Sequence, residues 1–425
     1  MAAAEYLTTT VTSALKTFYI DTFLSHFHEV LVLQGAGQST EIPEAGGKTA
    51  DWFRYHPADI VTSAGTEGLL GSDTTFLSFA GFNVTATVET WNNQWRFSEL
   101  VHLTSRDRRL EKAAELVGQN AAESIERETL KILAESNIWP LPANAINSST
   151  GAQDAGAYVE DVTVATATST TVLMLTDATL TITSTDVLDD VLVGGWMCVS
   201  KGAGYGHSAR ITAYTSDNRQ ITFTPALPEA AVVAGGTNPT KITIGTPFSN
   251  QDLLATGDIL TTEILQKAEE VLFKNGAKPM DDGFFAVYIH PAVYRNLLND
   301  STWVALMQNL NGSSGLQNAE IGTWSRMKFF RMTTAARYAA TAETANSFSS
   351  TAGDVYVTLA MGKDSFGVVS LSGHSTPQLN IKIPGPNDGN TENPNNLYGT
   401  MGWKLYWKAK PLNANFCVGI MTHQG

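Results

Sequence analysis

The run Gly47-Lys48-Thr49 has the residue types that end a phosphate-binding loop. In such a loop, backbone amides and a lysine hold nucleotide phosphates, and another glycine stands five residues before the Gly-Lys pair. Here that position is Ile42, and no strand-to-helix pattern surrounds the run. The spacing therefore argues against nucleotide binding.

Other candidate sites fail on similar grounds. His26-Phe-His28-Glu29 could supply a metal pair, but these histidines would lie on different faces of a helix, with no further ligand cluster nearby. Gly202-Ala-Gly204-Tyr-Gly206 opens no helix, which favours a hairpin turn over a dinucleotide site. Asp281-Asp282 precedes a glycine and reads as a polar turn. None of the eight histidines stands near a nucleophile in a recognisable catalytic context. We expect no catalytic, cofactor or metal site, and no enzyme activity.

Composition narrows the class of protein. The chain has 425 residues, 43 % of them hydrophobic, which is enough for a sizeable core in two or three domains. A net charge of −14 disfavours wrapping of DNA through phosphate neutralisation. Cys198 and Cys417 alone make no disulfide framework, so a reducing cytoplasm is the simpler folding site. The start lacks the pattern of a secretory signal, and no apolar run approaches the ~18 residues of a membrane span.

The first third of the chain combines an arm, strands and a long helix. Residues 1–40 read as an aromatic-rich arm that must pack on its own core or on a neighbouring subunit. Residues 82–97 alternate with period two, as a half-buried strand does. Residues 104–138 predict a long helix with one apolar face, and charged side chains, Glu126 among them, on the remainder. At ~1.5 Å per residue this helix would extend roughly 50 Å, so it must lie across something extended.

The middle of the chain changes character at residue 158. Between 158 and 245, threonine and valine dominate and short strands recur between turn residues, which predicts a small β-barrel or sandwich inserted into the fold. The predicted strands are Val162–Thr166, Thr171–Leu175, Trp196–Ser200, Ala209–Tyr214 and Gln220–Thr224. We expect this segment to fold semi-independently.

The last part returns to mixed helices and strands. The predicted elements are a helix at 258–275, a strand at Phe284–Ile289, a short helix from Pro291 to Leu298, strands at Met327–Met332 and Val355–Met361, and an antiparallel hairpin of Met401–Lys410 with Asn415–Met421. Together with the first third, this pattern is typical of an α+β protein.

The order of several segments resembles a known family. The segments are 46–55, Thr66-Glu67-Gly68, 84–97, 113–122, 128–130, 274–279, Ile289-His290-Pro291, Trp303, Gly312, 318–322 and 362–367. Their order is similar to that in the N-four-type major capsid proteins of tailed bacteriophages, which have the Hong Kong 97 (HK97) fold. The resemblance covers nearly everything except about 158–245.

The resemblance implies an α+β, HK97-like capsid fold. Its parts would be an N-terminal arm at 1–40, an extended E-loop at 41–81, a peripheral domain at 82–142 and 386–425 with the spine helix 104–138, an inserted β domain at 158–245, which we place on the outer face, and an axial domain at 246–385. Candidate assembly-interface residues are Phe18, Phe23, Lys48, Trp52, Arg54, Trp303 and Trp324.

The implied function is structural. The chain would be a major capsid protein that self-assembles into hexamers and pentamers, forming an icosahedral head around double-stranded DNA without sequence-specific binding. Its partners would be copies of itself, a portal protein, and scaffolding and decoration (cement) proteins. It would be assembled in the host bacterial cytoplasm and reside in the virion capsid, with no cofactor and no membrane.

Two alternatives stay open. An encapsulin-like shell of a bacterial nanocompartment has the same fold but encloses an enzyme. The gene's neighbours, portal and terminase genes or a cargo enzyme, would separate the two. A β-rich surface or adhesion protein would fit the Thr-rich segment 158–245, but it would need a secretion signal.

Overall fold

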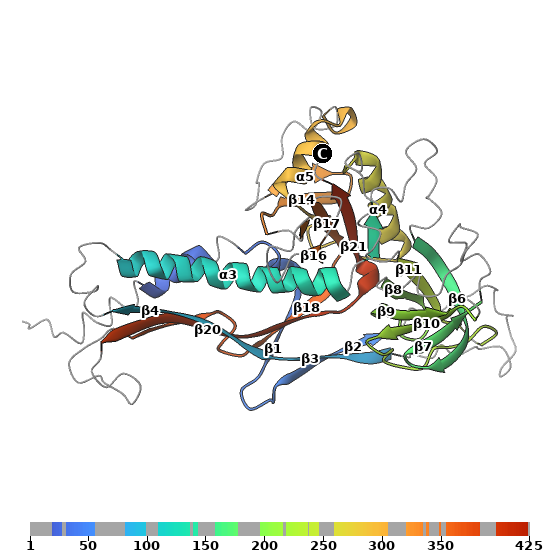
Figure 1. Cartoon of the computed structure of the whole chain (residues 1–425), viewed down its shortest axis with the longest axis horizontal. Helices are drawn as coiled ribbons and strands as arrows, with labels where there is room; N and C mark the ends of the chain where they lie inside the picture. The colour runs from blue at the N-terminus through green and yellow to red at the C-terminus, as the bar shows by residue number, and fades with distance from the viewer. Residues whose placement is uncertain are drawn as a thin grey trace, which may run out of the picture.

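The structure is a computed structural model of the chain. It describes residues 19–27, 31–55, 81–98, 109–136, 139–142, 158–176, 196–215, 218–236, 238–245, 259–304, 320–334, 337–339, 348–349, 354–382 and 397–423. The molecule is elongated (Figure 1). Helix α3 (Arg109–Ser136) lies along a layer of long strands, a lobe with α4 (Thr262–Lys274) and α5 (Pro291–Leu298) stands above the middle of this layer, and a barrel occupies one end.

The layer beneath α3 is a five-stranded sheet, here called the long sheet. Its strands are β1 (Gln38–Ile42), β4 (Glu89–Ser98), β18 (Phe366–Leu371), β19 (Gln378–Lys382) and β20 (Tyr398–Pro411). β20 pairs with β4 on one side and with β18 and then β19 on the other. β1 joins β18 in parallel, so residues 38–40 of the predicted arm belong to this sheet.

The lobe contains an eight-stranded sheet, here called the upper sheet. Its strands are β5 (Trp139–Pro142), β12 (Phe285–Ile289), β13 (Glu320–Trp324), β14 (Met327–Arg331), β15 (Arg337–Ala339), β16 (Phe348–Ser349), β17 (Val355–Met361) and β21 (Cys417–His423). Every residue of β12, β17 and β21 is buried. Alternate residues of β17 face opposite cores: Val357 and Leu359 meet the α3 side, and Tyr356 and Ala360 meet α4. The upper sheet thus separates two cores.

Helix α3 confirms the predicted apolar face. Ala114, Ala121, Ile125 and Leu133 are fully or almost fully buried, on the side that packs against β20. The 28 described residues correspond to about 42 Å, and residues 104–108 and 137–138 lie outside the described part. The prediction that Glu126 lies among the charged side chains outside the buried face is wrong, because this residue is only 2 % exposed. Among the described residues, no helix combines the length and apolar character needed to cross a membrane.

Six strands within residues 158–245 form a closed barrel. Its strands, β6 (Tyr158–Ser169), β7 (Val172–Leu175), β8 (Trp196–Lys201), β9 (Ser208–Thr215), β10 (Gln220–Thr224) and β11 (Lys241–Gly245), close in the order β10-β7-β6-β11-β8-β9. The five predicted strands are confirmed. β11 was missed, although it closes the barrel between β6 and β8. Inward-facing side chains such as Val164, Leu173, Met197 and Phe223 form a separate core.

Two strand predictions are corrected by the structure. Residues 81–98 form two strands, β3 (Gly81–Thr87) and β4, which pair with different partners. The predicted hairpin of 401–410 with 415–421 is wrong, because the short helix η4 (Ala414–Phe416) turns the chain between β20 and β21. β20 pairs along all ten residues of β4, and β21 along all seven of β17. These longer pairings leave the two strands in different sheets.

Candidate assembly surface

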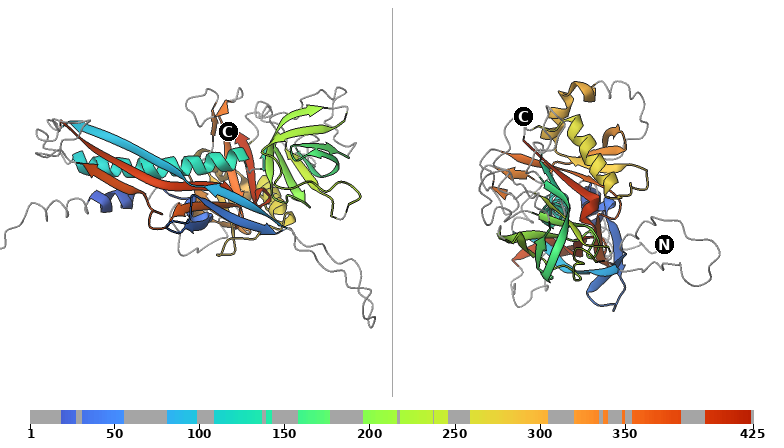
Figure 2. Two further views of the ribbon diagram at one scale, coloured as in Figure 1. Left: turned by 90° about the horizontal axis from the view of Figure 1, so that it is seen from below. Right: turned by 90° about the vertical axis from the view of Figure 1, so that its right-hand side faces the viewer.

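Strands β2 (Thr49–Tyr55) and β3 form a two-stranded antiparallel ribbon, here called the hairpin, that ends near the barrel (Figures 1 and 2). Side chains alternate across β2. Ala50 and Trp52 are buried, Arg54 is half-buried, and the residues between them are exposed. The hairpin therefore has an inner face against the body and an outer face without cover among the described residues.

Trp52 anchors the inner face. Its indole lies on Gly367 of β18, where a Cβ atom would stand 2.7 Å from the ring. Its Nε1 donates a hydrogen bond to Oγ1 of Thr40 at 3.0 Å. Because only a glycine leaves room for the indole, the type of residue at 367 fixes how closely the hairpin approaches the long sheet.

Arg54 lies further along the same face, between the hairpin, Tyr205 of the barrel and Asp364 before β18. Burial lowers the pKa of Arg54 to about 10, against the opposing influence of Tyr205 and Asp364. Its Nη1 has no hydrogen-bond partner among the described residues. The guanidinium is thus held between two regions of the body, with part of its hydrogen-bonding capacity unused.

The outer face of the hairpin carries two exposed aromatic rings. Phe53 is 54 % exposed and Tyr55 67 %, and their ring centroids lie 4.7 Å apart, edge to face. Gly81 is the partner of Tyr55 across the ribbon. A Cβ at residue 81 would lie 2.7 Å from the Phe53 ring and would also clash with the carbonyl oxygen of Arg54. Gly81 therefore leaves room for the Phe53 ring beside the ribbon backbone.

A groove opens towards the other end of the molecule, between α3 and the long sheet. It has a volume of about 480 Å³ and is mainly apolar. Trp95 of β4 and Leu116 of α3 line it and are 42 % and 62 % exposed. At its floor, Asn120 Oδ1 accepts hydrogen bonds from Trp403 Nε1 and Asn93 Nδ2. Large exposed apolar side chains around a concave surface are typical of a binding surface.

Buried hydrogen bonds attach the barrel to the body. Asn415 of η4 accepts from the Cys198 thiol at 3.0 Å and donates to the Val199 carbonyl at 3.0 Å. The Tyr205 hydroxyl donates to the carbonyl of Asn275 at the end of α4. The barrel therefore has its own core but a fixed orientation, since moving it would leave these buried polar groups unpaired.

The arm packs on α3 of its own chain over the described residues. Phe23 and Phe27, on a helix over 19–27, are 0 % and 2 % exposed. Gly118 allows this close crossing, because a Cβ there would lie 2.6 Å from the Phe23 carbonyl oxygen. Further on, Glu126 accepts the backbone N–H groups of Val32 and Leu33 at 2.7 and 3.0 Å. Of the two targets left open by the sequence, this segment uses its own core.

The seven predicted interface residues fall into four groups. Phe23, Trp52, Trp303 and Trp324 are buried within their own chain. Lys48 is exposed in the turn before β2, Arg54 is half-buried, and Phe18 lies outside the described residues. The interface assignment stays a prediction. The structure adds Phe53, Tyr55, Trp95 and Leu116, which sequence reasoning did not select. Alternation with Trp52 would have placed Phe53 and Tyr55 on the opposite face.

The motifs considered for chemistry have structural roles. Thr49 begins strand β2 and not a helix, which removes the basis for a phosphate-binding loop at Gly47. Gly202–Gly206 forms the turn between β8 and β9, as predicted. Asp281 and Asp282 pair with Lys363 and Lys328. Within the described part of the chain, no group of three His, Cys, Asp or Glu side chains could hold a metal ion, and His28 lies outside that part.

Comparison with known proteins finds solved structures that are similar to this chain in fold. No family model matches the chain, and no curated protein matches it. The capsid of Ralstonia phage GP4 is similar with a TM-score of 0.51 at 9 % identity, over 93 % of this chain and 92 % of that one. The chain has the fold of a phage capsid protein. The capsid of cyanophage P-SCSP1u is also similar, with a TM-score of 0.48 at 10 % identity over 93 % and 89 % of the two chains.

Proposed function

We propose that the chain is a major capsid protein that self-assembles into hexamers and pentamers, which build an icosahedral head around double-stranded DNA. The observation that carries this proposal is the likeness in fold to the GP4 capsid over more than nine-tenths of both chains. The order along the chain of the segments that resemble N-four-type capsid proteins supports the same conclusion from the sequence alone. They also favour the HK97 type within the capsid folds.

The placement of two exposed surfaces supports ring formation. Strand β2, which carries Phe53 and Tyr55, reaches the barrel end, whereas strand β4 lies towards the opposite end (Figure 1). The groove is lined by Trp95 of β4 and by Leu116 of α3. Surfaces so far apart cannot meet within one chain. A contact between them is head-to-tail, and head-to-tail contacts generate closed rings when the rotation closes. In this proposal each hairpin packs on the groove of the next copy.

The proposal gives each part of the chain a role. The proposed bounds are 1–40 for the arm, 41–81 for the E-loop, 82–142 and 386–425 for the peripheral domain, and 246–385 for the axial domain around the symmetry axes. The sheets cross these bounds, because β18 and β19 belong to the long sheet and β5 and β21 to the upper sheet. The 158–245 barrel is an inserted domain on the outer face, where it does not compete with DNA for space. The net charge of −14 suits a container wall, because strong phosphate binding would hinder packing and release.

Assembly of the purified chain is the direct test. Size-exclusion chromatography with light scattering and negative-stain microscopy should show capsomers or closed shells. Replacing Phe53 and Tyr55 together by serine should shift the chain towards monomers, whereas Val233→Ser on the barrel, 37 % exposed in the wild type, should not. A monodisperse wild-type monomer at high concentration would contradict the proposal.

The contents of particles separate the capsid from a nanocompartment shell. Particles from a phage lysate should carry nuclease-protected double-stranded DNA and contain portal protein. An enzyme cargo without DNA would favour the nanocompartment shell. In intact particles, protease should reach the barrel before the upper sheet. Protection of the barrel would contradict its outer placement.

A further inference from the structure

The long sheet differs in charge from the rest of the chain. Its five strands contain two acidic residues, Glu41 and Glu89, and five basic residues, which are Arg96, Lys382, Lys404, Lys408 and Lys410. Of the 27 basic and 41 acidic residues in the chain, 22 and 39 therefore lie elsewhere, and the remainder has a net charge of −17. A strongly acidic chain thus contains one basic sheet.

Strand register places all five cations on the same face of this sheet. Trp403 and Trp407 of β20 pack in the core beside α3, so the three lysines of β20, at even-numbered positions, point to the opposite face. Thr400, also at an even-numbered position, pairs with Arg96 of β4 and with Lys382 of β19, so these two cations share that face. This side of the long sheet, turned away from α3, is here called the basic face.

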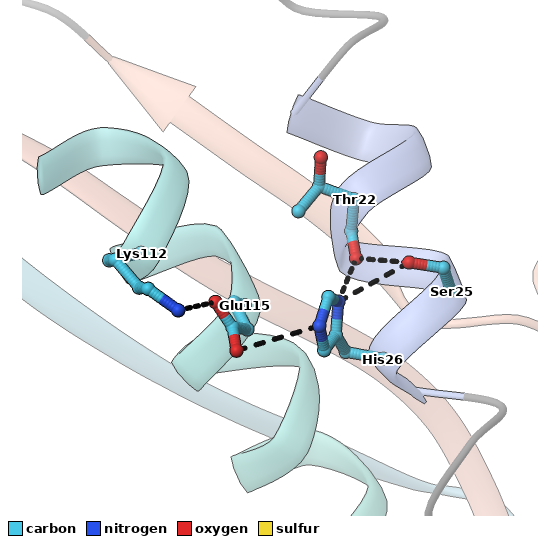
Figure 3. A network of polar contacts seen from close by, with 5 residues as sticks. All are labelled: Thr22, Ser25, His26, Lys112 and Glu115. Atoms are coloured by element: carbon cyan, nitrogen blue, oxygen red, sulfur yellow. Dashed lines mark hydrogen bonds and ion pairs between the residues drawn. The ribbon is translucent and has the colours of Figure 1, made fainter. Parts of the chain in front are cut away.

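The basic face lacks carboxylates of its own chain. Glu89 accepts a hydrogen bond from Lys408 at 2.9 Å, and it is the only carboxylate within ion-pair distance of the five cations among the described residues. The other side of the sheet differs, because there Lys112 of α3 lies 2.6 Å from Glu115 of the same helix (Figure 3). Four of the five charges on the basic face are therefore not neutralised by the described part of their own chain.

The cations of the basic face are also accessible and positioned. Each of the five side chains is exposed or half-buried. Lys404 lies over the ring of Tyr406 and Arg96 over the ring of Tyr398, each with its charged group 5.1 Å from the ring centroid. A cation held over an aromatic ring has less freedom to lose when it binds a carboxylate.

We propose that the basic face docks an acidic surface of a neighbouring copy of this chain. This inference rests on the proposed function, in which many copies assemble. Like charges on one face repel each other, and an oppositely charged partner offsets that cost. Every copy supplies such a partner, because the part of the chain outside the long sheet carries a net charge of −17.

Packaged DNA is the competing polyanion for the basic face. The acidic remainder of the chain repels DNA, and a wall that held phosphates tightly would hinder packing and release. A neighbouring copy has neither disadvantage, and in an assembling shell it is always present.

Lysine acetylation, measured by mass spectrometry, tests the proposal on shells assembled from the purified chain alone, which contain neither DNA nor a second protein. Lys382, Lys404 and Lys410 should react at least about fivefold more slowly in shells than in unassembled chains, because a partner covers them. Lys201 on the barrel is the internal reference and should not change. In shells mixed from two isotopically labelled pools, a carbodiimide should join the three lysines to acidic residues of another copy.

The outcomes separate this inference from the proposed function. Shells in which the three lysines react as fast as in unassembled chains would overturn the inference alone. Protection that appears only in particles from a phage lysate would also overturn it, in favour of DNA or an accessory protein. A purified chain that forms no capsomers or shells would contradict both.

Charge reversal gives a second test. Lys382→Glu combined with Lys410→Glu should raise the chain concentration needed for assembly by at least about tenfold, because the face would then repel its acidic partner. Lys201→Glu combined with Lys241→Glu on the barrel changes the net charge equally and should have no such effect. Hydrogen exchange of β20 in the unassembled variants checks that the sheet still folds. Equal effects of the two double variants would show that net charge alone is responsible and would overturn the proposal.

Discussion

The barrel and the hairpin lie close together at one end of the molecule but are stabilised in opposite ways. The barrel closes on itself and fills its interior with its own side chains, including Met197 and Phe223. The hairpin has only two strands and no interior. Its inner face depends on Gly367 beneath Trp52 and on the pocket around Arg54.

Among the residues whose burial is described, this difference explains why the hairpin, and not the barrel, exposes aromatic rings to solvent. Two strands alone cannot bury both faces, and a two-stranded ribbon is marginal in water without support. Once the body covers Trp52, the side chains of Phe53 and Tyr55 necessarily point outward. A closed barrel leaves no such constraint, since all its large apolar residues can turn inward. Substitutions at Phe223, Trp52 and Tyr55 test this contrast, and a substitution at Glu126 tests the attachment of the arm. They are given below in order of expected effect.

Phe223→Ala should have the largest effect. The side chain is 1 % exposed within the barrel, and removing a buried phenyl ring costs about 4 kcal/mol of unfolding free energy. Hydrogen exchange should accelerate in β9 and β10 and stay unchanged in β2 and β3. Val233→Ala, at an exposed barrel position, is the control and should cost under ~0.5 kcal/mol. Equal loosening of barrel and hairpin would show that the barrel core is not separate.

Trp52→Ala should cost about 3 kcal/mol, near the low end for a buried indole because the surrounding cluster is small. Exchange should accelerate in residues 49–55 and 81–87 and not in the barrel. Gly367→Ala should loosen the same residues by about 1–3 kcal/mol, since its Cβ would displace the indole. If hydrogen exchange accelerated equally in the barrel, the stability of the barrel would also depend on the packing of Trp52.

Glu126→Ala should cost about 2 kcal/mol, because it leaves the N–H groups of Val32 and Leu33 without an acceptor. Glu126→Gln keeps the Oε1 acceptor and should cost less. Burial raises the pKa of Glu126. A carboxyl with a raised folded-state pKa destabilises the fold increasingly as pH rises from about 4 through that value.

The glutamine variant should therefore gain stability relative to the wild type between pH 4 and pH 7. Urea-unfolding midpoints at both pH values measure this change. Glu41→Gln, at an exposed position of β1, should show no such trend. If the stability of Glu126→Gln relative to the wild type rose as the pH fell, the expected direction would be contradicted.

Tyr55→Ser should have the smallest effect on stability, under ~0.5 kcal/mol, because the ring is 67 % exposed. Thermal melting of the unassembled chain measures it. Gly81→Ala, across the ribbon, should cost more, since its Cβ meets the Arg54 backbone. If the two substitutions were equally costly, the tyrosine ring would have a folding role that its exposure does not indicate.

Local patterns in the sequence predict the elements well but not their partners. The apolar period around Ala121 and Ile125 predicts α3, and Thr- and Val-rich runs between turn residues predict five of the barrel strands. Burial of Glu126 depends on Val32, which lies 94 residues away. The burial of Trp52 depends on a glycine at position 367, far along the chain. A local sequence pattern does not record contacts over such distances. For this reason several aromatic residues that were predicted at an interface, such as Trp52, are buried in the core.

The path of the chain from β20 to β21 has a mechanical consequence. The backbone leaves the long sheet, turns at η4, where the Asn413 side chain accepts from the amide of Asn415, and enters the upper sheet directly. A pull on the outer end of β20 is transmitted through covalent bonds to β21. There, seven residue pairs with β17 hold β21 in the upper sheet. The continuous segment β20–η4–β21 therefore couples the two sheets mechanically.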